Sequence, residues 1–278
     1  MKAISKDEDA LSMQEIQSVS FEILKSLRSL CHKLGLRYSL AFGTLIGAVR
    51  HKGYIPWDDD VDIVMSRPDF NKLCDYMTSN PQQYPYYKIW NRSKNAKYPY
   101  MMSRMIDTRY KLIVKNEEDC GMGIFVDIYV LDGAGNSLEE AQKLLSKTKK
   151  FPSSIYSATR KHFRWGRTEG IRRYLKPLFY WYTKIMGREY FENRLRQIIQ
   201  KHPYADYDYV ACIEWDNTTS SVIAKEDLEN PIDMEFNGEF FSVMRNYDKY
   251  LRLAYGDYMT PPPEKDRIYH HLYRAYRK

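Results

Sequence analysis

The stretch Asp58-Asp-Asp-Val-Asp-Ile-Val-Met65 restricts the fold of this chain more than any other segment. It alternates acidic and apolar residues, which is typical of a strand with one buried face. Residues two apart in a strand point to the same face, so Asp60 and Asp62 project together, with Val61 and Ile63 packed behind them. Two adjacent carboxylates repel each other at neutral pH unless a cation lies between them. The stretch therefore predicts a sheet whose strand binds a metal ion.

A second acidic position and a glycine motif accompany this strand. Gly123 to Val130 is predicted to be a strand with a lone acid, Asp127, among apolar neighbours, and a buried lone carboxylate needs a cation nearby. Upstream, Gly43 and Thr44 end a short apolar strand, and a brief helix, Leu45 to Val49, follows. Glycine lets the backbone approach a ligand, and a helix N-terminus favours phosphate. Mg²⁺ or Mn²⁺ suits such a site, since hard ions bind carboxylate oxygens beside phosphates.

The periodicity predicts an α/β unit with a mixed sheet flanked by helices in the first 135 residues. The expected elements are helices from about Asp7 to Leu34 and from Asp69 to Met77, and strands over Arg37–Phe42, Asp58–Met65, Tyr86–Trp90, Met101–Ile106, Tyr110–Val114 and Gly123–Val130. We expect this catalytic core to span residues 1–135.

The rest of the chain is expected to form two further parts. A basic helical segment, residues 136–205, carries helical periodicity over Ser137–Lys150 and Ile171–Lys201, interrupted at Pro152, Gly166, Gly170 and Pro177. A C-terminal α/β extension, residues 206–278, packs on the core. It is predicted to contain a hairpin around Met234–Val243, a helix near Asp248–Leu253 and a terminal helix after Pro261–Pro263.

The segment Phe42 to Ile63 strongly resembles the signature of the LicD family. LicD proteins are phosphotransferases of the nucleotidyltransferase superfamily, best known for moving phosphocholine from CDP-choline onto bacterial glycans. Gly121 to Gly133 resembles the family's second block. Tyr255 to Arg267, with His270 and His271 after it, resembles its C-terminal block. The resemblance spans roughly residues 15 to 271, and the basic middle is its least typical part.

The resemblance assigns roles to five residues. Asp60 and Asp62 match the metal-binding pair. Asp127 matches the third carboxylate, which shares a metal ion and helps to deprotonate the incoming hydroxyl. Gly43 and Thr44 match the motif that holds the phosphates of the donor.

Four further residues are candidates for substrate binding, each with a structural alternative. Asp58 lies on the strand face of the acidic pair and either reaches the metal or caps a helix, whereas Asp59 should face the other way. Arg50 either grips a phosphate with its planar fork or pairs with one of these two acids. Trp57 either plugs the core or forms an aromatic wall. Arg267 either closes over the phosphates or ties down the C-terminal segment.

The expected reaction is metal-dependent transfer of phosphocholine from CDP-choline to a hydroxyl of a bacterial cell-surface glycan precursor, in teichoic acid, capsule or lipopolysaccharide. The 25 tyrosines suit a quaternary ammonium group or a sugar. The alternatives are transfer of ribitol or glycerol phosphate from its CDP donor, a nucleotidyltransferase that releases pyrophosphate, and an inactive binding module. All three acids are present, which argues against the last.

The charge distribution and the cysteines predict where the chain acts. Lys143 to Lys201 carries 16 Lys and Arg against three Glu, in a chain of net charge +7. Basic helices with aromatic faces lie at anionic membranes, although a solvated face or a nucleic-acid surface has a similar composition.

No apolar run approaches the roughly 18 residues that cross a bilayer, and the N-terminus is acidic where a signal peptide is apolar. Four scattered cysteines indicate reduced thiols. We expect a cytoplasmic enzyme with peripheral contact to the inner membrane, a lipid-linked or glycan acceptor and no nucleic acid.

Overall fold

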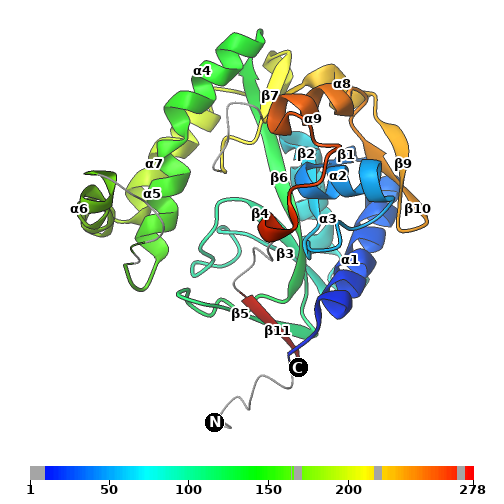
Figure 1. The fold of residues 1–278 in the computed structure, drawn as a ribbon, viewed down its shortest axis with the longest axis horizontal. Helices are drawn as coiled ribbons and strands as arrows, with labels where there is room; N and C mark the ends of the chain where they lie inside the picture. The colour runs from blue at the N-terminus through cyan, green and yellow to red at the C-terminus, as the bar shows by residue number, and fades with distance from the viewer. Residues whose placement is uncertain (1–9, 164, 166–170, 216–220, 268–272) are drawn as a thin grey trace.

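A computed structural model describes residues 10–163, 165, 171–215, 221–267 and 273–278 (Figure 1). The elements follow in the order α1 (Met13–Leu34), β1 (Tyr38–Leu40), α2 (Phe42–His51), β2 (Asp62–Ser66), α3 (Arg67–Ser79), β3 (Tyr87–Trp90), β4 (Ser103–Asp107), β5 (Tyr110–Val114), β6 (Ile124–Gly135), α4 (Leu138–Thr148), α5 (Lys150–Thr159), α6 (Ile171–Met186), α7 (Arg188–Ile199), β7 (Tyr209–Ala211), β8 (Val222–Ala224), α8 (Lys225–Glu229), β9 (Ile232–Phe236), β10 (Glu239–Val243), α9 (Tyr247–Tyr255) and β11 (Tyr273–Arg277).

The strands in these ranges form a nine-stranded mixed sheet and a separate antiparallel pair, β5 and β11. The main order is β3-β4-β6-β2-β1-β10-β9, and β7 joins the C-terminal end of β6 and carries β8. In Figure 1, α4 to α7 stand to the left of the long β6, and α1 to α3 stand to its right. The predicted α/β fold with a mixed sheet flanked by helices is confirmed.

The longest helix, α1, begins and ends at clear sequence signals. Ser12 and Glu15 form a capping box, which is why the helix begins at Met13 and not at Asp7; residues 1–9 are outside the described ranges. Gly35 ends it in the left-handed region with a φ of 62°. The apolar side of α1, including Ile23 and Leu27, is fully buried in the main core, which also contains β6 and β4 residues.

Three central strands set up the site. β2 runs parallel to β6 with Asp62 opposite Asp127, and β4 runs antiparallel to β6 with Arg104 opposite the same Asp127. Side chains in register on neighbouring strands point to the same face of a sheet. Arg104, Asp127 and Asp62 therefore lie in one row across three strands.

Two elements next to the site differ from the expectation. α2 begins at Phe42, so Gly43 and Thr44 lie in its first turn and not in a loop before it. The reason is a bond from the Asp62 backbone N–H to the Thr44 hydroxyl, which holds this turn against the start of β2. β2 in turn begins at Asp62, after a turn in which the Asp58 N–H donates to the Ile55 carbonyl.

The helical segment also differs in its boundaries. Pro152 does not separate two helices; it lies in the first turn of α5, where its missing N–H has no intrahelical acceptor. α6 continues through Pro177, where the missing N–H removes one backbone hydrogen bond without ending the helix. Gly166 and Gly170 lie outside the described residues.

The C-terminal region contributes strands to both sheets. β9 and β10 form the predicted hairpin around Asn237 and Gly238, both with positive φ, as a two-residue hairpin turn requires. β10 then pairs in parallel with β1 through Val243 and Leu40. The predicted terminal helix is wrong: residues Tyr273–Arg277 form β11, whose alternating pattern buries Ala275 against β5.

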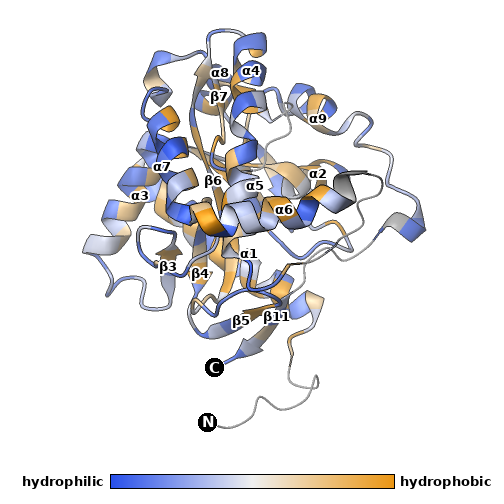
Figure 2. Ribbon diagram, turned by 90° about the vertical axis from the view of Figure 1, so that its left-hand side faces the viewer, coloured by the Kyte–Doolittle hydropathy of each residue, from blue (hydrophilic) through white to orange (hydrophobic). Residues whose placement is uncertain are grey.

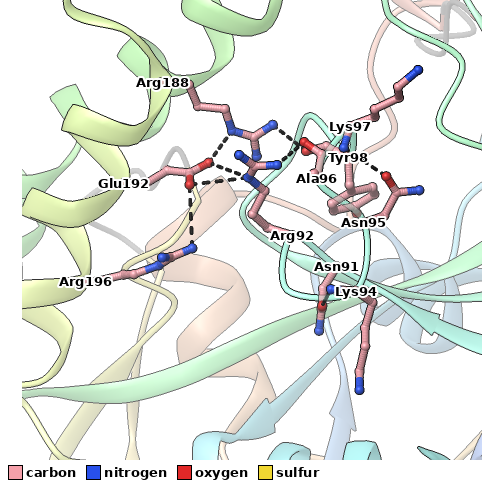
Figure 3. A network of polar contacts seen from close by, with 10 residues as sticks. All are labelled: Asn91, Arg92, Lys94, Asn95, Ala96, Lys97, Tyr98, Arg188, Glu192 and Arg196. Carbon is pink, nitrogen blue, oxygen red and sulfur yellow. Dashed lines mark hydrogen bonds and ion pairs between the residues drawn. The ribbon is translucent and has the colours of Figure 1, made fainter.

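A buried ionic network joins α7 to the loop after β3 (Figure 3). Glu192 is only 2% exposed and is bound by three arginines, Arg92, Arg188 and Arg196. Arg188 Nη1 also donates to the Tyr98 carbonyl at 2.5 Å. One carboxylate thus fixes the helical segment against the loop that leads into β4.

The helices and the cysteines bear on the expected location of the chain. None of the helices in the described ranges combines the length and the apolar character that crossing a bilayer requires. All four cysteines are free thiols, and three of them, Cys31, Cys120 and Cys212, are buried.

Candidate active site

The three predicted carboxylates meet at one point. Asp60, Asp62 and Asp127 each offer an oxygen atom, and these atoms lie within 4.8 Å of one another. Asp62 and Asp127 are buried and Asp60 is half-buried. Asp62 and Asp127 meet through the register of β2 and β6, whereas Asp60 lies just before β2 and not on the strand face that the alternation predicted.

This oxygen cluster suits a hard divalent cation. Carboxylate oxygens are the ligands that Mg²⁺ and Mn²⁺ take in phosphate chemistry, and three of them leave positions for oxygens of a substrate. Buried carboxylates this close together repel one another without positive charge. The donor set therefore fits a metal ion, although its chemistry does not single out which one.

Arg104 is a residue of this site that the sequence analysis missed. Its Nε donates to Asp127 Oδ1 at 2.6 Å, and both side chains are buried. Its guanidinium carbon lies 3.7 Å from the centre of the Phe125 ring and 4.5 Å from that of Tyr100. The signal was an arginine inside the apolar strand Ser103–Asp107, because a buried arginine needs an acidic partner.

The first turn of α2 positions the acids rather than presenting an open loop. The Thr44 hydroxyl accepts the Asp62 N–H at 2.8 Å. A Cβ atom on residue 43 would lie 2.7 Å from Asp58 Oδ2, so glycine there leaves room for this carboxylate in its present position. Asp58 thus lies at the N-terminus of α2, where the helix dipole favours negative charge. Asp58 is outside β2, and its role as a cap of α2 stays a prediction.

Arg50, Trp57 and Arg267 gather beside the other end of α2. Arg50 donates to the Tyr258 carbonyl at 2.6 Å and to His51 Nε2 at 2.9 Å. The Arg267 guanidinium lies over the Trp57 ring, 5.0 Å from its centre. Burial and the positive charge of Arg267 lower the pKa of Arg50. Two repelling guanidinium groups next to an aromatic ring form a site that attracts anions.

The sequence also made predictions about Asp59 and about two C-terminal histidines. Asp59 is buried and accepts a hydrogen bond from the Tyr273 hydroxyl, so it is held by the C-terminal strand, away from the cluster as expected. His270 and His271 are outside the described residues.

Aromatic rings surround the acids, and the sequence analysis did not single them out. Phe42 and Tyr129 are 4.7 Å apart between ring centres, and Trp215 lies 6.1 Å from Tyr129. Burial and the charges of three carboxylates, Asp62 first, raise the pKa of Tyr129 well above its usual value. Burial and the charges of Asp62, Asp58 and Asp60 also raise the pKa of Tyr255, although its side chain is 47% exposed. The available signal was the spacing of Tyr129, two residues after Asp127 on one strand face.

Comparisons with known proteins assign the family. The pattern described as "LicD/FKTN/FKRP, nucleotidyltransferase domain" matches residues 35–156. The chain is also 31% identical to the lipopolysaccharide cholinephosphotransferase LicD of Haemophilus influenzae, over 96% of this chain and 98% of that protein. The chain belongs to the LicD family. The family resemblance and the expectation of a transferase enzyme are thereby confirmed.

The LicD pattern covers the whole carboxylate cluster, since residues 35–156 include β1, α2, β2, β4 and β6. An uncharacterised protein of Rickettsia prowazekii is 43% identical over 49 residues, which is 18% of either chain. In this LicD-family chain, the match to the Haemophilus protein extends beyond the pattern, through the basic helices and the C-terminal strands.

Proposed function

We propose that this protein transfers phosphocholine from CDP-choline to a hydroxyl group of a bacterial cell-surface glycan precursor. The observation that carries the proposal is the convergence of Asp60, Asp62 and Asp127 in a chain that matches a lipopolysaccharide cholinephosphotransferase along nearly its whole length. Teichoic acid and capsule precursors remain alternatives to lipopolysaccharide as the acceptor class.

Asp60, Asp62 and Asp127 would hold a divalent cation, Mg²⁺ or Mn²⁺, which when bound neutralises charge on the phosphate oxygens of the donor. The chain's own residues position the reactants. Arg104 fixes the Asp127 carboxylate, and Thr44 fixes the backbone of Asp62. Gly43 leaves room for the Asp58 carboxylate beside the start of α2.

The reaction is an in-line displacement at the phosphorus of phosphocholine. The bond from this phosphorus to the bridging oxygen breaks, and CMP leaves with the bond's electron pair. The acceptor oxygen forms the new bond to phosphorus, and its proton passes to the Asp127 carboxylate and then to solvent. Arg50 lies seven residues after Gly43 on α2, about 10 Å along the helix axis. From there, Arg50 and Arg267 bind negative charge of the donor that lies beyond the transferred phosphate.

The aromatic rings favour phosphocholine over a polyol phosphate. A quaternary ammonium is attracted to ring faces by about 0.5–2 kcal/mol per ring, whereas ribitol or glycerol needs groups that bind hydroxyls. Two partly open rings are Trp215, which is 6.1 Å from the Tyr129 ring, and Tyr255, whose pKa the charges of the acids raise. Tyr255→Ala should raise the KM for CDP-choline about tenfold, whereas Tyr86→Ala, which removes an equally exposed ring elsewhere, should leave it unchanged.

The protein acts in the cytoplasm and contacts the inner membrane face through α6. Support comes from an outward stripe, which we define as Tyr174, Leu178, Trp181 and Ile185, at helical spacings of four, three and four. These side chains are 73%, 67%, 62% and 81% exposed. Figure 2 shows α6 at the front of the molecule with hydrophobic residues among hydrophilic ones. A basic, aromatic helix of this kind suits an anionic bilayer.

The deciding experiment incubates the protein with CDP-choline, CDP-ribitol or CDP-glycerol, with Mg²⁺ and an oligosaccharide acceptor. Release of CMP from CDP-choline is the expected result, and EDTA should abolish it until Mg²⁺ or Mn²⁺ is restored. CMP release from CDP-ribitol or CDP-glycerol alone would replace phosphocholine by a polyol phosphate. Release of pyrophosphate from CTP with a small-molecule acceptor would support nucleotidyl transfer instead.

A further inference from the structure

A cavity of about 460 Å³ lies between the sheet and the helical segment. β4, β5 and β6 and the first residue of β11 form its inner wall, and α5 and α6 form its outer wall. It meets the carboxylate site at Arg104, which lines the cavity and donates to Asp127. Its volume is within the range of roughly 300–1,000 Å³ that small-molecule sites occupy.

Two charged side chains in the lining of this cavity have unused hydrogen-bonding capacity. Glu117 is 6% exposed and Arg160 is 9% exposed. Glu117 Oε1 accepts from Arg160 Nη1 and from the Tyr100 hydroxyl, each at 2.6 Å. Glu117 Oε2 and Arg160 Nε and Nη2 are buried and make no hydrogen bond to any residue in the described ranges. Buried polar atoms are almost always hydrogen-bonded, so one acceptor and two donors here indicate a ligand rich in hydroxyl groups.

Aromatic side chains form much of the remaining wall. Tyr156, Phe163 and Phe179 line it from the helical side, and Tyr100 and Phe125 line it from the side of the sheet. Aromatic rings pack on the apolar C–H faces of a sugar ring, while charged side chains bind its hydroxyls. This combination of walls and centre suits a saccharide.

The cavity lies on the side of Asp127 that in-line transfer requires for the acceptor. The strand order β4-β6-β2-β1 places Asp127, on β6, between two neighbours. Asp62 and α2, where the donor would bind, are on the β2 side, and Arg104 and the cavity are on the β4 side. In an in-line displacement, the attacking oxygen and the leaving group approach phosphorus from opposite sides.

The charge of the lining adds a preference for an anionic ligand. Asp127 balances Arg104, and Glu117 balances Arg160. Lys115 and Lys176 also line the cavity and add two positive charges. We infer that this cavity binds the acceptor, and that the acceptor is a saccharide that carries phosphate. The inference rests on the proposed phosphotransfer and adds to it the place and the chemical class of the second substrate.

The test measures binding to the full chain without any donor. The probes for saturation-transfer difference NMR are glucose, galactose, N-acetylglucosamine and the 6-phosphate of each. We expect the phosphorylated probes to bind, and Phe179→Ala and Tyr156→Ala each to weaken their binding at least fivefold. Both rings are about half exposed, so their removal should leave the fold intact. Lys176→Met should weaken the binding of the phosphates and leave any binding of the neutral sugars unchanged.

Matched controls remove similar rings elsewhere. Phe240→Ala on β10 and Tyr190→Ala on α7 should change the Kd less than twofold. The inference is overturned if no probe binds to the wild type, if both cavity variants bind like the wild type, or if CDP-choline displaces the probes. Absence of CMP release from CDP-choline would defeat the proposed function, whereas these binding results would still decide what the cavity holds.

Discussion

Arg104 determines how the third carboxylate is presented. It lies opposite Asp127 in the register of β4 and β6, and its Nε holds Oδ1 of that side chain. Burial would make either charge unfavourable alone, so the two residues depend on each other. Asp127, to which the resemblance assigns proton transfer, therefore also stabilises the fold by balancing the charge of Arg104.

Asp127→Asn should lower turnover by about 10²–10⁴-fold, the usual loss for a general base. It should also destabilise the fold by about 3–5 kcal/mol, because Arg104 stays buried without its counter-charge. The double variant Asp127→Asn/Arg104→Met should recover most of the stability, measured by urea unfolding, and none of the turnover. Recovery of turnover in the double variant would show that Asp127 acts only by holding Arg104.

Asp62→Asn should reduce kcat about 100-fold or more, because it removes one negative charge from the metal-binding cluster at nearly constant volume. Binding of Mn²⁺, followed by electron paramagnetic resonance, should weaken in parallel. Asp75→Asn, on the exposed side of α3, is the control and should behave as the wild type. Normal Mn²⁺ binding in Asp62→Asn would remove this residue from the metal site.

His51 should titrate below its ordinary pKa of about 6.5, because burial and the nearby Arg50 charge disfavour its protonated form. The unfolded chain then binds the proton more readily. The contribution of His51 to stability is therefore present above about pH 6.5 and is lost as pH falls through the folded-state pKa. NMR titration of the ring should show Arg50→Met raising this pKa. A pKa unchanged by Arg50→Met would exclude the proposed effect of charge.

At the scale of elements, the ionic network around Glu192 keeps α7 in place. α5, α6 and α7 contact one another, and α5 and α6 form the outer wall of the cavity. The three arginines come from α7 itself and from the loop before β4 (Figure 3). The position of the cavity wall thus depends on the carboxylate of Glu192, which is far along the chain from the three acids of the cluster.

Glu192→Ala should destabilise the protein by about 3–5 kcal/mol, because burial already lowers the pKa of Arg188 and the substitution removes its counter-ion. Glu189→Ala, on the exposed side of the same helix, should change the free energy of unfolding by less than about 0.5 kcal/mol. Urea unfolding of both variants gives the comparison. Equal stability of the two variants would mean that the network contributes nothing to the fold.

Strong local signals made several elements predictable from the sequence. The apolar spacing of α1 and the Asn237-Gly238 turn depend on neighbouring residues only. The terminal strand β11 was predicted as a helix, because its strand form depends on β5, more than 150 residues away. Pro177 was expected to interrupt α6 for the same reason: proline is a local signal, and helix packing overrides it here.

At the scale of the whole molecule, α6 lies at the front of the view in Figure 2, and the side chains of its outward stripe are exposed. The carboxylate cluster could be predicted because its acids lie in or next to two recognisable strands, β2 and β6. The rings of Trp215 and Tyr255 could not, because only the fold brings them to the acids. The same limit applies to Arg160 and Glu117, which are 43 residues apart in the chain.

The membrane contact of the whole molecule should depend on both the stripe and the charge. The protein should bind vesicles of phosphatidylglycerol and release them as salt rises, because each Lys or Arg near the surface adds about 1 kcal/mol. Leu178→Glu/Ile185→Glu should reduce this binding at least tenfold in a sedimentation assay and leave turnover on a soluble acceptor unchanged. Lys249→Glu, on α9, serves as the control for the added charge. Absence of vesicle binding by the wild type would contradict the membrane role of α6.

The parallel pairing of β1 with β10 has a consequence for synthesis of the protein on the ribosome. Leu40 emerges about two hundred residues before its partner Val243. At about 5–20 residues per second, the hydrogen-bonding edge of β1 stays uncovered for roughly 10–40 seconds. Exposed strand edges pair with other chains, so the nascent protein passes through a period in which it is prone to aggregate. Chaperone demand during translation should therefore end when the β9–β10 hairpin leaves the exit tunnel.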